Sequence, residues 1–169
     1  TNQSRVWVCD ITYSQTKEGV LYLTTIIDLY KKKMIGWSLS NGMNTEETTL
    51  AAWKMAIRNR NVQKELIFHS DWGVQYANKK FANTIESYGV IRSMSRKGNC
   101  WDNAVAESLF KSLKTELIYG NKLINKEQME LEIFEYIEIW YNKKRRHGAL
   151  NYKTIEEFNN QNNIYKNVA

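Results

Sequence analysis

The chain has 169 residues, 43% of them hydrophobic, and carries a formal net charge of +6 with a pI near 9.2. This length allows one sizeable core and argues against two ordinary domains; the charge suggests a polyanionic partner such as nucleic acid, although a basic protein without such a partner would look the same. No apolar run is long enough to span a membrane, and the two cysteines lack the spacing of a disulfide framework or a zinc site, so we expect a reducing, intracellular setting.

Apolar runs alternate with turn-forming residues near the start of the chain. The runs at 6–13, 20–27 and 34–39 predict three strands in an antiparallel meander. The first run is apolar at consecutive positions, including Trp7 and Val8, which is typical of a central strand covered on both faces.

After position 44 the spacing of apolar residues becomes helical, interrupted by two short apolar runs. The order of elements predicts an α/β fold with a five-stranded mixed sheet and helices on both faces. The predicted elements are a helix over 44–60 that starts at Asn44 and Glu47, a strand over 66–68, a helix around Phe81 and Ile85, a strand over 90–94, a helix over 101–119, a long helix from Asn125 through Trp140, and a short helix from Thr154 followed by a polar tail from Asn159.

Three carboxylates lie where solubility does not explain them. Asp10 and Asp71 each follow or end an apolar strand, and Glu107 lies in the first half of a helix with a well-defined apolar side. Burying an isolated carboxylate is costly unless a partner or a metal compensates its charge. For Asp10 taken singly, satisfaction by backbone amides is an equally good explanation.

The residues around Glu107 can be placed by the helical rotation of about 100° per residue. Asn103 and Lys111 lie about 40° to either side of Glu107, and Lys114 about 20° away, so the four share one face. Glu116 lies on the opposite side. The shared face combines one acid with amines, although a solvated helix face remains an alternative for the two lysines.

Such a combination suits chemistry at a phosphodiester. Two hard cations about 4 Å apart can activate an attacking oxygen and stabilise a leaving oxygen, and Mg²⁺ prefers carboxylate and water ligands. Lysines on the same face could hold the flanking phosphates.

The triad Asp10, Asp71 and Glu107, with 35 residues between the last two, resembles the D, D-35-E signature of retroviral integrases and insertion-sequence transposases. The surrounding segments are similar to second-frame transposase proteins of bacterial insertion sequences over nearly the whole chain. These segments are WVCDITY, YLTTIIDLYKKKMIGWSLS, HSDWGVQY, SMSRKGNCWDNAVAESLFKSLKTEL and YNKKRRHGALNYKT.

The resemblance implies a ribonuclease-H-like fold and a DDE transposase core that performs DNA cleavage and strand transfer in transposition. Asp10, Asp71 and Glu107 would be catalytic ligands of two Mg²⁺ ions, for which Mn²⁺ would substitute. Water would nick one strand, and the freed 3′-hydroxyl would attack a second phosphodiester, with no covalent protein intermediate. The partners would be element ends, target DNA and further copies of the chain, without zinc or membrane, in the bacterial cytoplasm at the nucleoid. The expected DNA-binding residues are Arg96, Lys97, Asn103, Lys111 and Lys114.

The same resemblance predicts one integrase-like catalytic core over 1–169, with a ribonuclease-H-like part over about 1–120 and a C-terminal helical extension over about 121–169. The helix-turn-helix region that precedes this core in relatives is expected to be absent. Trp72 replaces the usual Arg after the second Asp, and Asn151 and Ile155 replace the usual Gly and Pro, which raises a question about turn geometry near the C-terminus.

Other polar residues have simpler explanations. Asp28 is expected to close a strand, and Asp102 to support the start of the Glu107 helix. His69 is expected to be a hydrogen-bonding neighbour of the site rather than a base. The basic run 143–147 could hold a DNA backbone or could be a solvated helix end. Two other functions remain alternatives: a ribonuclease-H-like nuclease without strand joining, and an inactive DNA-binding relic.

Overall fold

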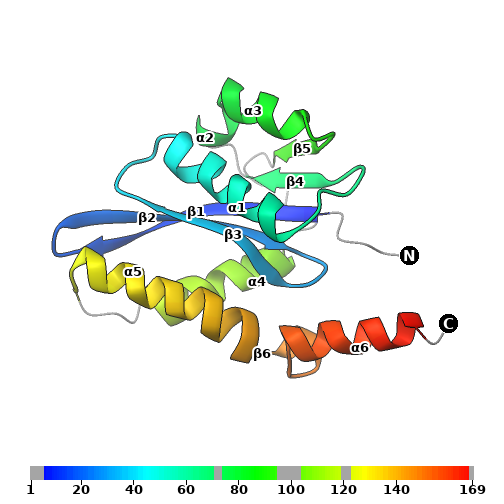
Figure 1. Cartoon of the computed structure of the whole chain (residues 1–169). Coiled ribbons are helices and arrows are strands. Elements are labelled where there is room, and N and C mark those ends of the chain that lie inside the picture. The colour runs from blue at the N-terminus through cyan, green and yellow to red at the C-terminus, as the bar shows by residue number, and fades with distance from the viewer. Residues whose placement is uncertain (1–5, 71–73, 95–103, 119–122, 168–169) are drawn as a thin grey trace.

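A five-stranded sheet forms the centre of the molecule (Figure 1), and the computed structural model describes residues 6–70, 74–94, 104–118 and 123–167. The strand order is β3-β2-β1-β4-β5, so the fourth strand lies beside the first. Every strand of this sheet was predicted from the sequence, which confirms the mixed five-stranded architecture. The strands are β1 (Val6–Thr16), β2 (Gly19–Asp28), β3 (Lys33–Ser40), β4 (Ile67–Ser70) and β5 (Ile91–Met94).

The first three strands form the predicted antiparallel meander, whereas β4 pairs in parallel with both β1 and β5. β1 continues beyond its predicted end at position 13, because its pairing with β2 extends to Thr16 opposite Gly19. Gly19 has a φ of 112°, a conformation that residues with a Cβ rarely adopt, and the Thr16 hydroxyl donates to its carbonyl at 2.6 Å. A glycine therefore allows this tight connection.

Both faces of the sheet are covered, as the consecutive apolar residues of β1 predicted. Trp7 and Val8 are 1% and 4% exposed and belong to two different apolar clusters, because neighbouring residues of a strand point to opposite faces. On the Trp7 face, Trp53 packs against Trp7 and Phe68 with ring centroids 5.6 and 5.7 Å apart. The Val8 face is the one that matters for the site described below.

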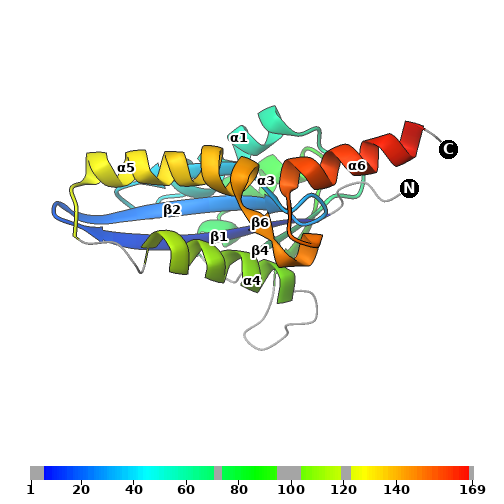
Figure 2. The same cartoon turned by 90° about the horizontal axis from the view of Figure 1, so that it is seen from below.

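Two groups of helices cover these faces. On the Trp7 face lie η1 (Glu46–Leu50), α1 (Ala51–Asn59), α2 (Val74–Ala77) and α3 (Lys79–Glu86). On the Val8 face lie α4 (Ala104–Leu113), η2 (Lys114–Ile118), α5 (Lys126–Phe134) and η3 (Glu135–Lys144). Figure 2 shows α4 and α5 side by side across this second face. Within the ranges given above, no helix is long and apolar enough to cross a lipid bilayer.

The predicted helix starts agree with the hydrogen bonds. Asn44 accepts from the backbone of Glu47 at 2.9 Å, and Asn125 accepts from the backbone of Gln128 at 2.8 Å. Such caps satisfy amides that have no partner in the first turn of a helix. The chain has no proline, and its capping side chains include Asn44, Asn78, Asn125 and Thr154.

The expectation of a short last helix and a polar tail from Asn159 is wrong. The last helix, α6, spans Ile155–Asn167. Thr154 and Glu157 form a reciprocal capping box, with backbone-to-side-chain bonds of 2.8 and 3.2 Å, and Ile155 is 1% exposed. The strong cap and this apolar anchor outweigh the low helix propensity of the asparagines.

Before α6, a small hairpin that the sequence did not predict is formed by β6 (Arg146–His147) and β7 (Lys153–Thr154), which flank η4 (Gly148–Leu150). Asn151 follows η4 with φ 54° and ψ 44°, the left-handed conformation that glycine adopts most easily. Asparagine tolerates this conformation better than most residues, so Asn151 can stand where the resemblance led us to expect glycine.

Candidate active site

The expectation that Asp10 ends a strand is wrong: it lies inside β1, opposite Thr25, because the pairing with β2 continues to Thr16. Asp10 is on the face that carries Val8. Its carboxylate is an ion-pair partner of Lys114, with Oδ2 and Nζ 3.1 Å apart, and the two side chains are 26% and 29% exposed. The pair therefore joins the central strand to the helical segment at 104–118. It lies at the rim of the covered face, where water and ions can still reach it.

The helical segment that carries Glu107 is held by an apolar stripe. Phe110, Leu113 and Leu117 are 8%, 1% and 4% exposed and belong to the cluster beneath the sheet. Glu107 itself is exposed, about two helical turns before Lys114. Besides this apolar stripe, the ion pair of Lys114 with Asp10 attaches the helical segment to β1.

The structure tests only part of the predicted site. It brings Asp10 and Lys114 together and leaves Glu107 and Lys111 exposed on α4. The four remaining predicted site residues lie outside the described residues. These four are Asp71, Arg96, Lys97 and Asn103.

The strand that leads to Asp71 runs beside β1. β4 is parallel to β1, with His69 opposite Val8, and its last residue is Ser70. The His69 ring nitrogen Nδ1 lies 3.0 Å from the Ser93 hydroxyl of β5, so His69 has a hydrogen-bonding partner on the neighbouring strand. Within the described ranges, no three His, Cys, Asp or Glu residues are grouped closely enough to hold a metal ion.

Asp28 has the structural role expected from its position at the end of β2. Its Oδ1 accepts from the backbone amides of Tyr30 and Lys31 at 3.0 and 3.2 Å, and Oδ2 lies 3.8 Å from Arg60 Nε. The side chain is fully buried. Backbone amides and an arginine explain this acid without any catalytic role.

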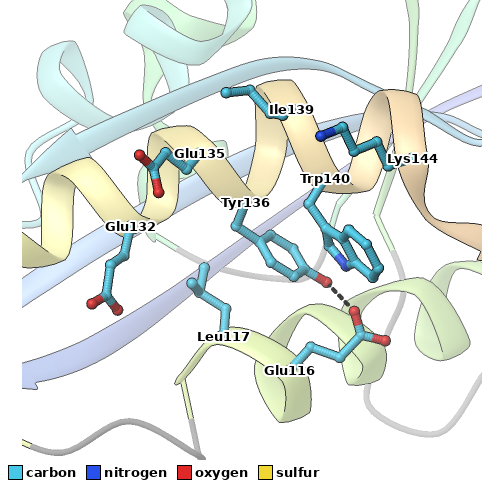
Figure 3. Close-up of a pocket in the computed structure, with 8 residues that line it drawn as sticks. All are labelled: Glu116, Leu117, Glu132, Glu135, Tyr136, Ile139, Trp140 and Lys144. Carbon is cyan, nitrogen blue, oxygen red and sulfur yellow. Dashed lines mark hydrogen bonds between the residues drawn. The ribbon is translucent and has the colours of Figure 1, made fainter.

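A second polar cluster joins the same helical segment to η3. Arg145 Nε and Nη2 donate to Glu116 Oε1 at 2.9 and 2.7 Å, and the Tyr136 hydroxyl donates to Oε2 at 2.7 Å. Figure 3 shows Tyr136 reaching across to the Glu116 carboxylate. Glu116 thus has its partners on η3 and at Arg145, whereas Lys114 of the same segment pairs with Asp10 of β1.

The electrostatics of this cluster follow from burial and hydrogen bonding. Burial alone would raise the Glu116 pKa, but the hydrogen bonds from Arg145 and Tyr136 outweigh it and lower the pKa. Burial raises the Tyr136 pKa, and the bond to Glu116 adds to that effect. At neutral pH the carboxylate is charged and the phenol keeps its proton.

The pairing of Arg145 with Glu116 has no signal in the sequence. The two residues are 29 positions apart, and the intervening helix ends carry no spacing that pairs them. The helical rotation does place Glu116 opposite Glu107, which gives its direction but not its partner. An open pocket of about 410 Å³ lies beside the cluster and is lined by Glu116, Leu117, Glu132, Glu135, Tyr136, Ile139, Trp140 and Lys144 (Figure 3).

Two family models, both described as integrase core domain, match residues 1–100 and 107–162. Among curated proteins, the chain is 41% identical over 162 residues to the transposase for insertion sequence element IS904 of Lactococcus lactis, covering 96% of this chain and 64% of that protein. It is 42% identical over 156 residues to transposase InsF for insertion sequence IS3A of Escherichia coli, covering 92% of this chain and 54% of that protein. The chain thus spans about half to two thirds of these relatives.

Solved structures show the same fold at low sequence identity. The catalytic core domain of BIV integrase superposes with a TM-score of 0.65 at 16% identity, covering 97% of this chain and 99% of that one. The HTLV-2 integrase catalytic core domain in complex with magnesium gives a TM-score of 0.62 at 17% identity, covering 92% and 95%. The ribonuclease-H-like fold expected from the sequence is confirmed.

Proposed function

The chain belongs to the integrase core domain family, and from this premise we propose that it is the catalytic core of an insertion-sequence transposase that cleaves DNA and joins a 3′-hydroxyl end to target DNA. The extent of the two transposase relatives supports this proposal, because they match nearly the whole chain. We further propose that residues 1–120 form the ribonuclease-H-like part and residues 121–169 its helical extension.

The ion pair between Asp10 and Lys114 is the observation that carries the proposal. It ties the strand of the first candidate acid to the helix of the third, Glu107, on one face of the sheet. The lysine ammonium at 3.1 Å is a positive charge beside this partly exposed carboxylate, which supports the proposal that Asp10 is ionised and available to a cation. Asp10 therefore fits a hard cation, and a solved relative of the same fold is a magnesium complex.

Asp10, Asp71 and Glu107 are the proposed ligands of two Mg²⁺ ions, for which Mn²⁺ substitutes. When bound, the ions would make a phosphodiester more electrophilic and stabilise the leaving oxygen. Water attacks the phosphorus, the bond to the 3′ oxygen breaks, and the proton lost by the water goes to that oxygen. The resulting 3′-hydroxyl then attacks the phosphorus of a second phosphodiester: a new P–O bond forms, the bond to the leaving oxygen breaks, and the hydroxyl proton goes to the leaving oxygen. The chain's own carboxylates hold the site's geometry throughout.

The remaining predicted residues are proposed to hold DNA. Lys111 is exposed on α4, and Lys114 can turn its flexible stem from Asp10 towards a phosphate. Arg96 and Lys97 come from the segment that follows β5, and Asn103 directly precedes α4. Cations on several segments around one carboxylate site would bind the backbone of a duplex without reading its sequence.

A joining assay tests the proposal. A labelled duplex with a free 3′-hydroxyl is incubated with supercoiled plasmid and Mn²⁺, and both nicked circles and labelled joined products are measured. The chain should produce both, and Glu107→Gln and Asp10→Asn should abolish both while circular dichroism stays unchanged. The matched control is Glu130→Gln, because Glu130 is an exposed glutamate on α5.

The two alternatives predict different products. A nuclease without strand joining would give nicked circles and no labelled product, and an inactive relic would give neither from any variant. Joined products that persist in Glu107→Gln would contradict the assignment of Glu107. We also propose that copies of the chain associate on DNA with paired ends, which sedimentation of the DNA complex tests; a strictly monomeric complex would refute this part.

A further inference from the structure

Besides the pair of Lys114 with Asp10, the carboxylate of Glu116 is a further polar attachment of the helical segment that carries Glu107 and Lys114. We propose that Glu116 and Arg145, with Tyr136, form a positioning clamp that sets where this segment lies along the sheet, and thereby where Glu107 lies relative to Asp10. This inference rests on the proposed function, since it concerns the geometry of that same site. None of the three clamp residues would touch DNA or metal.

The clamp contains more hydrogen bonds than the other ion pairs between described residues. Arg145 Nε lies 2.9 and 3.0 Å from the two oxygens of Glu116, Nη2 lies 2.7 Å from Oε1, and Tyr136 adds its bond to Oε2. The arginine side chain is 18% exposed, whereas the Lys80 and Glu46 side chains of an ordinary surface pair are 65% and 59% exposed. The Glu116 side chain is 34% exposed, so water reaches this pair, but several charge-assisted bonds from one planar guanidinium are more directional than the single bond of a surface pair.

The other contacts between the helical segment and the sheet do not fix the position of the segment along the helix axis. The stripe of Phe110, Leu113 and Leu117 holds the segment against the sheet, but apolar contact has no preferred direction along the helix axis. The pair of Asp10 and Lys114 involves a flexible lysine with one charged atom, which tolerates sliding. The planar guanidinium of Arg145 is the contact whose geometry a shift of the helix would break.

Arg145 is itself held in place on its other side. Its Nη1 lies 3.0 Å from Nδ1 of His147, and its guanidinium carbon lies 5.9 Å from the ring centroid of Tyr141. His147 is 3% exposed, and Tyr141 is fully buried. Burial, reinforced by the charge of Arg145, lowers the His147 pKa, so the ring is neutral near pH 7 and can accept from the guanidinium.

The elements that the clamp joins have separate anchors in the core. Figure 3 shows Glu116 on the helix that follows α4, while Tyr136 and Trp140 come from the facing helix. That facing helix, η3, is fixed to the sheet by Asn142, which exchanges hydrogen bonds of 3.0 and 2.9 Å with the backbone of Met34 in β3. The clamp therefore transfers the position of β3, through η3 and Arg145, to the Glu107 segment.

The test compares conservative variants of the clamp with a matched pair elsewhere. Glu116→Gln keeps the shape but removes the charge, Arg145→Lys keeps the charge but removes the fork, and Tyr136→Phe removes one bond only. The controls are Glu86→Gln and Arg92→Lys, because Arg92 Nε donates to Glu86 at 2.8 Å on the opposite face of the sheet. All variants are first checked by circular dichroism.

Three quantities are then measured. They are the Mn²⁺ dissociation constant, from electron paramagnetic resonance of free Mn²⁺; kcat and KM for plasmid nicking; and the distance between nitroxides placed by Thr115→Cys and Tyr13→Cys in a Cys100→Ser background. Thr115 and Tyr13 are exposed positions on the helical segment and on β1. The last quantity needs neither metal nor activity.

The clamp predicts a broader nitroxide distance distribution in Glu116→Gln and Arg145→Lys, about threefold to tenfold weaker Mn²⁺ binding, and kcat lowered about tenfold with KM little changed. Tyr136→Phe should show the same changes to a smaller extent, and the controls none. Folded clamp variants with the wild-type distance distribution, Mn²⁺ affinity and kcat would overturn the inference. If instead Asp10→Asn leaves Mn²⁺ binding unchanged, the proposed function fails, and the nitroxide distances still decide whether the clamp exists.

Discussion

Lys114 neutralises Asp10 in the protein as it stands. The pair is about one quarter exposed on each side, so water screens it and its stabilisation is modest. A divalent cation that binds Asp10 must either displace this ammonium or remain close to it. Displacement breaks the ion pair and proximity repels the cation, so the lysine weakens metal binding in both cases. The lysine that is proposed to hold DNA is then also a counter-ion that DNA could draw away from the acid. Metal and DNA would favour each other's binding.

Replacement of this lysine by a neutral residue should separate the two effects. In the DNA-free protein, Lys114→Gln should bind Mn²⁺ about twofold to fivefold more tightly, because an ion pair this exposed contributes up to about 1 kcal/mol. The same variant should bind DNA more weakly and with a smaller salt dependence. Electron paramagnetic resonance of free Mn²⁺ and filter binding at several salt concentrations measure the two effects.

The control for this prediction is the neighbouring exposed lysine. Lys111→Gln should also weaken DNA binding but should change the Mn²⁺ affinity of the DNA-free protein less, because Lys111 is exposed one turn earlier. An unchanged or weaker Mn²⁺ affinity in Lys114→Gln would show that the lysine does not compete at Asp10.

At the scale of elements, β3 and α1 are held close together by the absence of a side chain. A Cβ at Gly36 would overlap the carbonyl oxygen of Ala52 and lie 2.9 Å from Ala56 Cβ. Asn59 of the same helix donates to the Ile35 carbonyl at 2.8 Å, so the helix is fixed to the strand beside the glycine. Side-chain rotation cannot relieve a clash with the Ala52 carbonyl oxygen, because a backbone atom moves only if the helix moves.

Gly36→Ala should therefore destabilise the protein by about 3 kcal/mol, the upper end of the usual cost of overpacking a core. The urea midpoint should fall with little change in slope. Gly42→Ala is the matched control, because a Cβ there meets no atom within 4 Å, and it should change the free energy of unfolding by less than about 1 kcal/mol. Equal midpoints for the two variants would show that α1 can move away from β3 without loss.

At the scale of the whole molecule, the sequence predicted the sheet and its covered faces well, because each depends on local patterns. Consecutive apolar residues such as Trp7 and Val8 indicate a strand buried on both sides, and the capping asparagines indicate where helices begin. The helical rotation predicts Lys114 and Glu116 on opposite sides of their segment, and the structure gives them different partners, Asp10 and Arg145. These results need only a few neighbouring residues.

What the sequence could not predict depends on contacts between distant segments. The partner of Asp10 lies 104 positions away and that of Glu116 lies 29 positions away, and no local spacing connects them. The α6 error has the opposite origin: an asparagine-rich composition was given more weight than the Thr154 cap and the buried Ile155. That Asp10, Asp71 and Glu107 lie close together stays a prediction, because Asp71 lies outside the described residues.

His147 gives the whole molecule a predicted pH dependence. Burial and the charge of Arg145 lower its pKa from 6.5, while a hydrogen bond with the backbone of Tyr141 and the charge of Glu116 act in the other direction and Lys32 adds to the lowering. Between the folded-state pKa and 6.5, the unfolded chain binds a proton that the folded chain does not. The free energy of unfolding is therefore fully kept above pH 6.5 and falls as the pH drops through this window.

The expected loss is below about 1.4 kcal/mol per pH unit, which is the most that a difference of one bound proton can contribute. Urea unfolding of the wild type and of His147→Asn between pH 5.5 and 7.5 measures it, since the asparagine oxygen can accept from Arg145 as Nδ1 does but does not titrate. His69 is present in both proteins, so its own contribution cancels in the difference. The wild type should lose stability towards pH 5.5 and the variant should lose less. Parallel pH profiles would mean that His147 accepts its proton in the folded state, and that the guanidinium of Arg145 is held without the histidine.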